Sequence, residues 1–172
     1  VEPVPYNYKI LKSKFVESDN VQICTNVIYS ENKKKNFYYV KELSVTKLGK
    51  HWASGIGSFD KHHILNHKNK RFQITENDIE TIEIDFITFD DLVNKYQIQL
   101  IDELQIDVEG AEFEILNSIN FEKVKINSIQ FESKHFDGTF QEGPKLKAIK
   151  EKLKKKGYNI MQLDKENILA KK

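Results

Sequence analysis

The chain has 172 residues, with 27 Lys plus Arg against 26 Asp plus Glu and a formal net charge of +1. Neither sign dominates, so neither a nucleic acid nor a membrane is expected as a partner. Hydrophobic residues make up 39%, enough for a buried core, and residues 1–172 are expected to form a single domain. Cys24 is the only cysteine, and one thiol cannot form an internal disulfide, which favours a reducing, cytoplasmic location.

The first half of the chain predicts short strands, one helix and a long insert. A strand closes at Glu2, and Pro5 suits the first position of a helix because its fixed φ is helical and no N–H is needed there. β-Forming residues predict strands at 21–28 and 36–40, separated by a polar turn. Residues 44–78 hold three glycines, the only tryptophan and four of the five histidines, and this irregular stretch predicts a lid within the domain.

The second half alternates strand and helix signals. Residues 82–86 alternate apolar and acidic side chains and predict a half-exposed strand, and Thr88 with Asp91 predicts the capped start of a helix. Further strands are predicted at 104–107, 128–132, 158–163 and 167–170, with helices starting near residues 109–110 and at Pro144. This alternation predicts an α/β fold with a largely parallel sheet.

Acidic residues stand at three predicted strand ends, where open α/β sheets bind their ligands. These residues are Glu2, Asp107 and Glu132, the last followed by Lys134 and His135. Glu2 fits an acid that accepts the two hydroxyls of a ribose. We interpret Asp107 as functional, because an acid that completes an apolar strand has little structural purpose.

Two further acids follow Asp107, at Glu109 and Glu112. Both could merely complement the positive end of a helix, and for Glu112 this structural interpretation is preferred.

Other motifs carry weaker functional interpretations. Gly55-x-Gly57 lacks the third glycine of a phosphate-binding loop and is interpreted as a flexible loop or lid. His63 and His67 would share a helix face beside His62, but no cysteine or suitably placed glutamate completes a zinc site. No Gly-x-Ser-x-Gly elbow supports hydrolase chemistry. No metal site is therefore predicted from these residues.

Residues 101–116, Ile-Asp-Glu-Leu-Gln-Ile-Asp-Val-Glu-Gly-Ala-Glu-Phe-Glu-Ile-Leu, resemble the signature of FkbM-type S-adenosylmethionine-dependent methyltransferases. Weaker likenesses follow the family's order at residues 1–3, 21–30, 53–59, 128–135 and 157–170. The resemblance implies a Rossmann-like class I methyltransferase fold, a mostly parallel sheet with helices on both faces. It also implies S-adenosylmethionine as cofactor and methyl transfer to a hydroxyl of a sugar, glycan or related small metabolite.

The resemblance assigns roles to individual residues. The cofactor-binding residues it implies are Glu2 for the ribose, Asn26 and Val27 for the adenine, and Asp107 with Glu109 near the methyl group. Glu132 and His135 would lie on the acceptor side. The family's first strand and glycine-rich loop do not appear in this sequence, so we expect an N-terminally truncated excerpt of a longer chain.

The leading hypothesis is an O-methyltransferase in which His135 removes the hydroxyl proton, since imidazole titrates close to working pH. Asp107 is the second choice of base, with Glu132 as a further catalytic residue. A divalent cation held by Asp107 and Glu132 could acidify the hydroxyl instead, and is less favoured than the plain base.

Two other function classes stay open. One is a catalytically silent α/β module that binds a partner or self-associates as a homo-oligomer. The other is a nucleotide-sugar-binding enzyme of another reaction type, because a fold does not by itself fix a function. Trp52 could stack on a sugar acceptor or pack within the lid.

Overall fold

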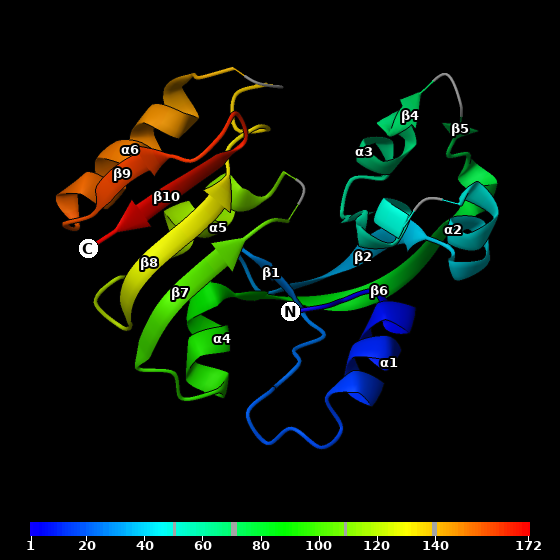
Figure 1. The fold of residues 1–172 in the computed structure, drawn as a ribbon, viewed down its shortest axis with the longest axis horizontal. Helices are drawn as coiled ribbons and strands as arrows, with labels where there is room; N and C mark the ends of the chain where they lie inside the picture. The colour runs from blue at the N-terminus through cyan, green and yellow to red at the C-terminus, as the bar shows by residue number, and fades with distance from the viewer. Residues whose placement is uncertain (50, 70–71, 109, 139–140) are drawn as a thin grey trace. The chain divides into compact units, whose positions relative to one another are not determined.

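The computed structural model describes residues 1–49, 51–69, 72–108, 110–138 and 141–172 (Figure 1). The described chain divides into two compact units. The first comprises Val1–Val27 and Asn32–Phe86, and the second comprises Ile28–Glu31 and Ile87–Lys172.

A β-ribbon organises the first unit. In its sheet, β6 (Ile79–Thr88), β2 (Lys33–Val40) and β3 (Gly57–Ser58) are neighbours in that order, while β1 (Val27–Tyr29) spans the point in the chain at which the first unit's opening segment ends. β2 pairs antiparallel with β6, and their register places Val40 opposite Ile79. The two ends of the intervening chain therefore meet, and the Lys41 N–H donates to the Asp78 carbonyl at 2.8 Å. The predicted insert therefore leaves the β2–β6 ribbon and returns to it at the same end.

The insert contains short regular elements around its own apolar cluster. These are α2 (Glu42–Leu48), the 3₁₀ helix η1 (His51–Gly55), α3 (Lys61–Asn66), β4 (Lys68–Asn69), β5 (Phe72–Gln73) and the 3₁₀ helix η2 (Glu76–Asp78). β4 and β5 pair as a two-stranded sheet. Ile64 and Ile74 are buried with Ala53 and Ile56, so apolar packing holds these short elements in place.

The chain before the ribbon differs from its predicted strands. α1 (Pro5–Lys14) begins at Pro5, as predicted. The strand predicted to end at Glu2 is wrong, and the strand predicted at residues 21–28 is correct only at its end, because β1 begins at Val27 and covers Val27–Tyr29. The Glu2 N–H donates to the Cys24 carbonyl at 2.8 Å. A strand needs a repeating ladder of such bonds, which β-forming residue types by themselves cannot ensure.

The sheet of the second unit has one parallel pair. Its order is β7-β8-β10-β9, with β7 (Leu100–Ile106), β8 (Lys125–Glu132), β10 (Asn167–Lys171) and β9 (Asn159–Gln162). β7 and β8 are parallel, whereas β10 runs antiparallel to both β8 and β9. The expected mostly parallel sheet is therefore wrong. Parallel neighbours need a crossover of about a dozen residues, and the short turn at 163–166 permits only antiparallel pairing.

Helices α4 (Phe89–Lys95), α5 (Glu112–Ser118) and α6 (Pro144–Lys155) complete this unit. The Thr88 hydroxyl accepts the Asp91 N–H at 3.1 Å, which confirms the predicted helix cap. α6 begins at Pro144 as predicted, and its buried residues are Leu146, Ile149 and Leu153, at helical spacing. The core joins buried residues of α4, α5, α6, β7, β8 and β10.

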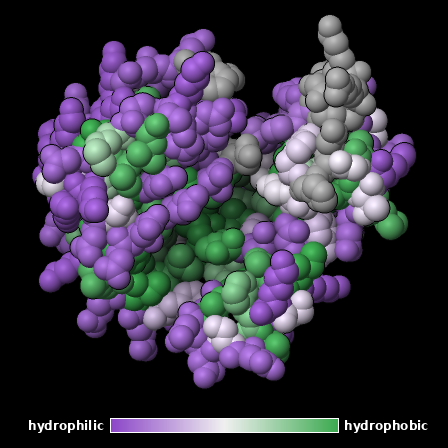
Figure 2. Space-filling view, in the orientation of Figure 1, coloured by the Kyte–Doolittle hydropathy of each residue, from purple (hydrophilic) through white to green (hydrophobic). Residues whose placement is uncertain are grey.

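Hydrophilic residues cover most of the face seen in Figure 2, in keeping with the 31% of charged residues. Among the helices that the structure describes, none combines the length and the apolar character needed to cross a bilayer.

Candidate functional site

The ends of β7 and β8 bring acidic side chains together. The parallel register pairs Ile106 with Phe131, so Asp107, which follows β7, and Glu132, which closes β8, lie at the same edge of the sheet. Glu112, the first residue of α5, returns to this edge. One carboxylate oxygen from each of Asp107, Glu112 and Glu132 lies within 4.8 Å of the others. The sequence pointed to two of these acids, and the structure adds Glu112.

The three carboxylates differ in exposure. Glu112 is 1% and Glu132 is 9% exposed, whereas Asp107 faces solvent. Like charges at this separation repel, and the repulsion grows where water is excluded. Each of the two buried acids therefore needs a source of positive charge or dipole close by.

Backbone N–H groups provide this for Glu112. Its carboxylate accepts the Val108 N–H at 2.9 Å and the Gly110 N–H at 3.1 Å. Burial raises the pKa of Glu112 above its ordinary 4.5, and the N–H groups of Val108, Glu112 and Gly110 offset only part of this rise; the Asp107 charge adds to it. Gly110 has φ +109°, a conformation that residues with a side chain rarely adopt.

The preferred interpretation of Glu112 as a helix-end charge is therefore incomplete. The residue does lie in the first turn of α5, but its carboxylate binds N–H groups of the preceding loop. The sequence did hold a signal for this arrangement. Gly110 stands two residues before the acid, between an apolar strand and a helix start, where a backbone conformation that favours glycine is common.

Lys134 provides the positive charge for Glu132. The Lys134 Nζ lies 3.2 Å from Glu132 Oε1 and 3.7 Å from Glu166 Oε2. The Ser133 N–H donates to the Glu166 carbonyl at 2.7 Å, which ties the end of β8 to the start of the neighbouring strand. Glu132 is thus held between its own strand and the β9–β10 turn.

His135, the predicted base, follows in a turn three residues beyond the end of β8 and is half-buried. The Phe136 N–H donates to the Ser133 carbonyl at 3.3 Å, and the Phe136 ring packs on Phe131 with centroids 5.8 Å apart. These contacts fix the turn on both sides of His135. Glu109, the remaining acid predicted for this edge, lies outside the described residues.

The other predicted cofactor residues belong to the first unit. The Glu2 carboxylate accepts the Val4 N–H at 2.8 Å and the Asn7 side-chain amide at 3.3 Å, and burial raises the pKa of Glu2. The Glu2 N–H donates to the carbonyl of Cys24, which precedes Asn26 and Val27 by two and three residues. The Asn26 side-chain amide donates to the Asp85 carbonyl at 3.3 Å, and Val27 begins β1.

Two of the weaker motifs make packing contacts. A Cβ at Gly57 would collide with the Phe37 ring, so this glycine is needed for packing in the β3 strand. The flexible loop expected at Gly55-x-Gly57 is therefore only partly correct. The His63 and His67 rings meet edge to face, 4.8 Å apart. Within the described residues, the group that could hold a metal ion consists of the three carboxylates and not of these histidines.

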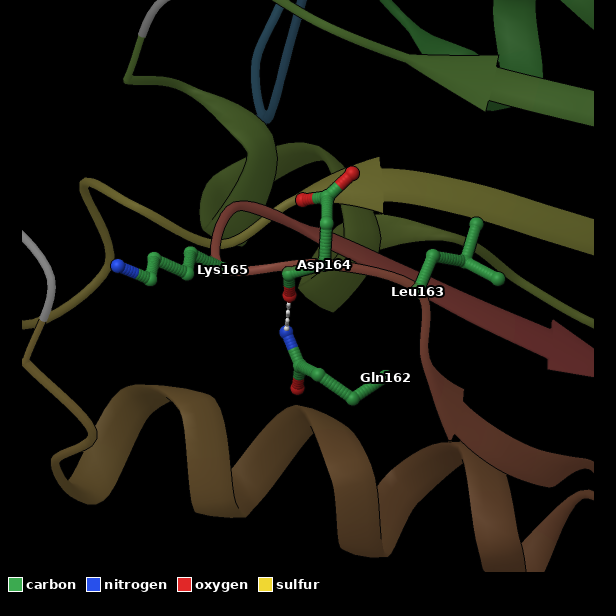
Figure 3. A pocket seen from close by; sticks show the side chains of 4 residues that line it. All are labelled: Gln162, Leu163, Asp164 and Lys165. Carbon is green, nitrogen blue, oxygen red and sulfur yellow. Dashed lines mark hydrogen bonds between the residues drawn. The ribbon is translucent and has the colours of Figure 1, made fainter.

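An open pocket of about 720 Å³ lies at the β9–β10 turn and is lined by Gln162, Leu163, Asp164 and Lys165 (Figure 3). The Gln162 side-chain amide donates to the Asp164 carbonyl at 2.7 Å. The Asp164 carboxylate accepts the backbone N–H groups of Glu166 and Asn167, both at 2.8 Å. These polar groups stabilise the turn itself, so the pocket adds no chemistry to the acidic edge.

Comparison with known proteins identifies the family but no individual relative. Residues 1–160 match the family model described as the methyltransferase FkbM domain. Searches of curated proteins and of solved structures give no match. The match covers most of the 172 residues and includes both the Glu2 region and the acidic edge of the second unit. The chain therefore belongs to the FkbM methyltransferase family.

Proposed function

We propose that this chain transfers a methyl group from S-adenosylmethionine to a hydroxyl of a sugar, glycan or related small metabolite. Family membership supports methyl transfer. The observation that carries the proposal is the meeting of Asp107 and Glu132 at the carboxyl edge of the parallel strands β7 and β8. That edge is where α/β sheets bind ligands, which suits the Rossmann-like arrangement that the family implies.

The chemistry of the polar groups fits this cofactor. A ribose presents two neighbouring hydroxyls, and the Glu2 carboxylate is an acceptor at the start of α1. A carboxylate offers about four acceptor positions, so its bonds to Val4 and Asn7 are compatible with accepting hydroxyls as well. Asn26 and Val27 are proposed for the adenine. Asp107, exposed at the strand end, is proposed to contact the reacting groups.

When bound, S-adenosylmethionine would supply a sulfonium methyl group, whose carbon would bond to the acceptor oxygen while sulfur would keep the electron pair of the broken carbon–sulfur bond. The His135 imidazole is proposed to take the hydroxyl proton, which typically contributes about 10²–10⁴ in rate. Asp107 is proposed to orient the acceptor hydroxyl. A cation held by Asp107 and Glu132 stays the less favoured route, because Lys134 already lies against Glu132.

Calorimetry with S-adenosylmethionine and S-adenosylhomocysteine, followed by transfer of a labelled methyl group to a panel of sugars and glycans, tests this function. We expect micromolar binding and transfer to at least one hydroxyl acceptor. Asp107→Ala and His135→Ala should remove turnover while circular dichroism stays unchanged. Asp102→Asn is the matched control, since Asp102 lies on β7, the strand that Asp107 follows, and accepts a surface hydrogen bond from the Asn127 amide at 3.0 Å.

The alternatives give distinct results. Full activity in both Asp107→Ala and His135→Ala would contradict the assigned roles. Activity that EDTA removes and Mg²⁺ restores would replace the base with a cation mechanism. Absence of both binding and transfer, combined with a stable oligomer in size-exclusion chromatography, would favour the interaction module.

A further inference from the structure

We propose that Glu112 is a positioning residue of the methyl-transfer site. Its buried carboxylate, bound to the N–H groups of Val108 and Gly110, fixes the turn that presents Asp107 at the edge of β7. This inference rests on the proposed function, because it assigns to Glu112 an effect on the reaction that passes through Asp107.

The bond to Val108 acts directly on the Asp107 backbone. The Val108 N–H belongs to the same planar peptide unit as the Asp107 carbonyl. Holding that N–H at 2.9 Å from Glu112 Oε1 therefore fixes the rotation of the Asp107 backbone, and with it the direction in which the Asp107 side chain leaves the strand. The helix α5 carries Glu112 and packs its Ile115 and Leu116 into the core, so the acceptor is itself rigidly placed.

The bond to Gly110 holds the turn in an unusual conformation. Gly110 has φ +109°, and nothing lies within 4 Å of where its Cβ would be. The glycine is therefore required by the backbone conformation and not by lack of space. Glycine loses more conformational freedom on folding than any other residue, so a hydrogen bond to its N–H helps to hold it in one conformation. The Glu112 carboxylate supplies it, with both oxygens within 3.3 Å of the Gly110 nitrogen.

Exposure separates the roles of the two acids. Glu112 is 1% exposed, and its carboxylate is directed at backbone N–H groups, so it has no surface for a substrate. Asp107 faces solvent a short distance away. Glu112 thus acts through Asp107. A misplacement of about 1 Å in a reacting group can cost about 10²-fold in rate, which sets the size of the expected effect.

The test compares Glu112→Gln with Glu114→Gln. Gln keeps one acceptor oxygen but places an NH₂ group against a backbone N–H, so the turn should loosen. Glu114 lies on the same helix and pairs with Lys145 at 3.4 Å, away from the loop bonds, which makes its variant the matched control. Amide NMR of the cofactor-free chain reports on the loop, and labelled-methyl kinetics report on the reaction.

In the wild-type chain, the Val108 and Gly110 amide resonances should shift together with pH, with a common midpoint above 4.5, the ordinary value for a glutamate, and should exchange slowly with deuterium. Glu112→Gln should abolish the titration and speed exchange. It should lower kcat about 10-fold to 100-fold with little change in KM for S-adenosylmethionine. Glu114→Gln should match the wild type in every measurement.

Several results would overturn the inference. A folded Glu112→Gln chain with wild-type kcat would remove the positioning role while leaving the proposed function intact. If Glu112→Gln fails to fold, the wild-type amides still decide: free exchange and no titration at Val108 and Gly110 would refute the loop contact. A wild-type chain that neither binds the cofactor nor transfers methyl contradicts the proposed function, and the positioning role falls with it.

Discussion

In two loops of the second unit, one carboxylate accepts hydrogen bonds from backbone N–H groups of the loop. The pKa values of these two carboxylates are nevertheless shifted in opposite directions. In one loop, Glu112 binds the backbone N–H groups of Val108 and Gly110. In the other, the Asp137 carboxylate accepts the N–H groups of Lys145 and Leu146 at 2.9 Å each, and a further bond from Gly143 at 3.1 Å. The hydrogen bonds are of the same kind, so something else sets the difference.

Burial and nearby charge make the difference. For Glu112, burial raises the pKa, the backbone bonds offset part of the rise and the neighbouring Asp107 adds to it. For Asp137, burial also pushes the pKa upward, but the three backbone bonds and the Lys145 charge together outweigh it, and the pKa lies below its ordinary value. The folded chain favours the ionised form of Asp137, which suits a carboxylate that stabilises a loop. It disfavours the ionised form of Glu112, and this cost is tolerated at the proposed site.

The largest expected contrast between the loops is in turnover. Asp107→Ala should lower kcat by about 10²-fold or more, because it removes the side chain proposed to orient the acceptor hydroxyl. Asp137→Ala should leave kcat close to wild type when assayed well below the melting temperature, since Asp137 closes the loop before α6. Labelled-methyl transfer at saturating acceptor measures both. Equal losses in the two variants would show that the loops do not differ in role.

Gly110→Ala should produce the largest stability loss in either loop. The substitution places a side chain on a residue at φ +109°, a strain of roughly 1–3 kcal/mol. Urea unfolding measures the free energy of unfolding directly. The Cβ would meet no neighbouring atom, so any loss reports backbone strain. An unchanged midpoint would mean that the turn relaxes to another conformation.

Gly143→Ala should destabilise the second loop by a different route and by less. Its Cβ would lie 2.6 Å from Asp137 Cγ, so the carboxylate has to move away from the N–H groups it binds. The double variant Asp137→Ala with Gly143→Ala should then be no less stable than Asp137→Ala alone, because both substitutions remove the same hydrogen bonds of the Asp137 carboxylate. Additive losses in this double-mutant cycle would contradict the shared mechanism.

The smallest effect is in the pH dependence of stability, where the loops should show opposite signs. The pKa of Asp137 is lowered in the folded chain, so Asp137 stabilises the fold above its unfolded pKa of about 4, and this stabilisation is lost on acidification. The difference in free energy of unfolding between wild type and Asp137→Asn should therefore shrink as the pH falls. The pKa of Glu112 is raised in the folded chain, so its contribution to stability is complete below its ordinary pKa of 4.5. That contribution is lost as the pH rises through the pKa of Glu112 in the folded chain.

Glu112→Gln should therefore gain stability relative to wild type as pH rises through that window. Urea unfolding at several pH values between about 3 and 7 measures both variants. The same sign of pH dependence in Asp137→Asn and Glu112→Gln would show that burial does not distinguish the two carboxylates.

The sequence alone determined the features that depend on near neighbours along the chain. Pro5 and Pro144 start helices, and the Thr88 hydroxyl caps α4, because helix starts are encoded within about one turn. Alternation at residues 82–86 marked part of β6 for the same reason. The fairly specific motif at residues 101–116 pointed to the family, which the match over residues 1–160 confirms.

Only the tertiary structure decided strand direction, burial and the gathering of the acids. Alternation of side chains is the same in parallel and antiparallel strands, so the antiparallel pairing of β10 could not be predicted from it. The burial of Glu112 depends on the packing of α5 with α6, a helix that is distant in sequence. The hydrogen-bond partners and the pKa of the Glu112 carboxylate follow from that packing. Its position beside Asp107 could therefore not be predicted from the sequence alone.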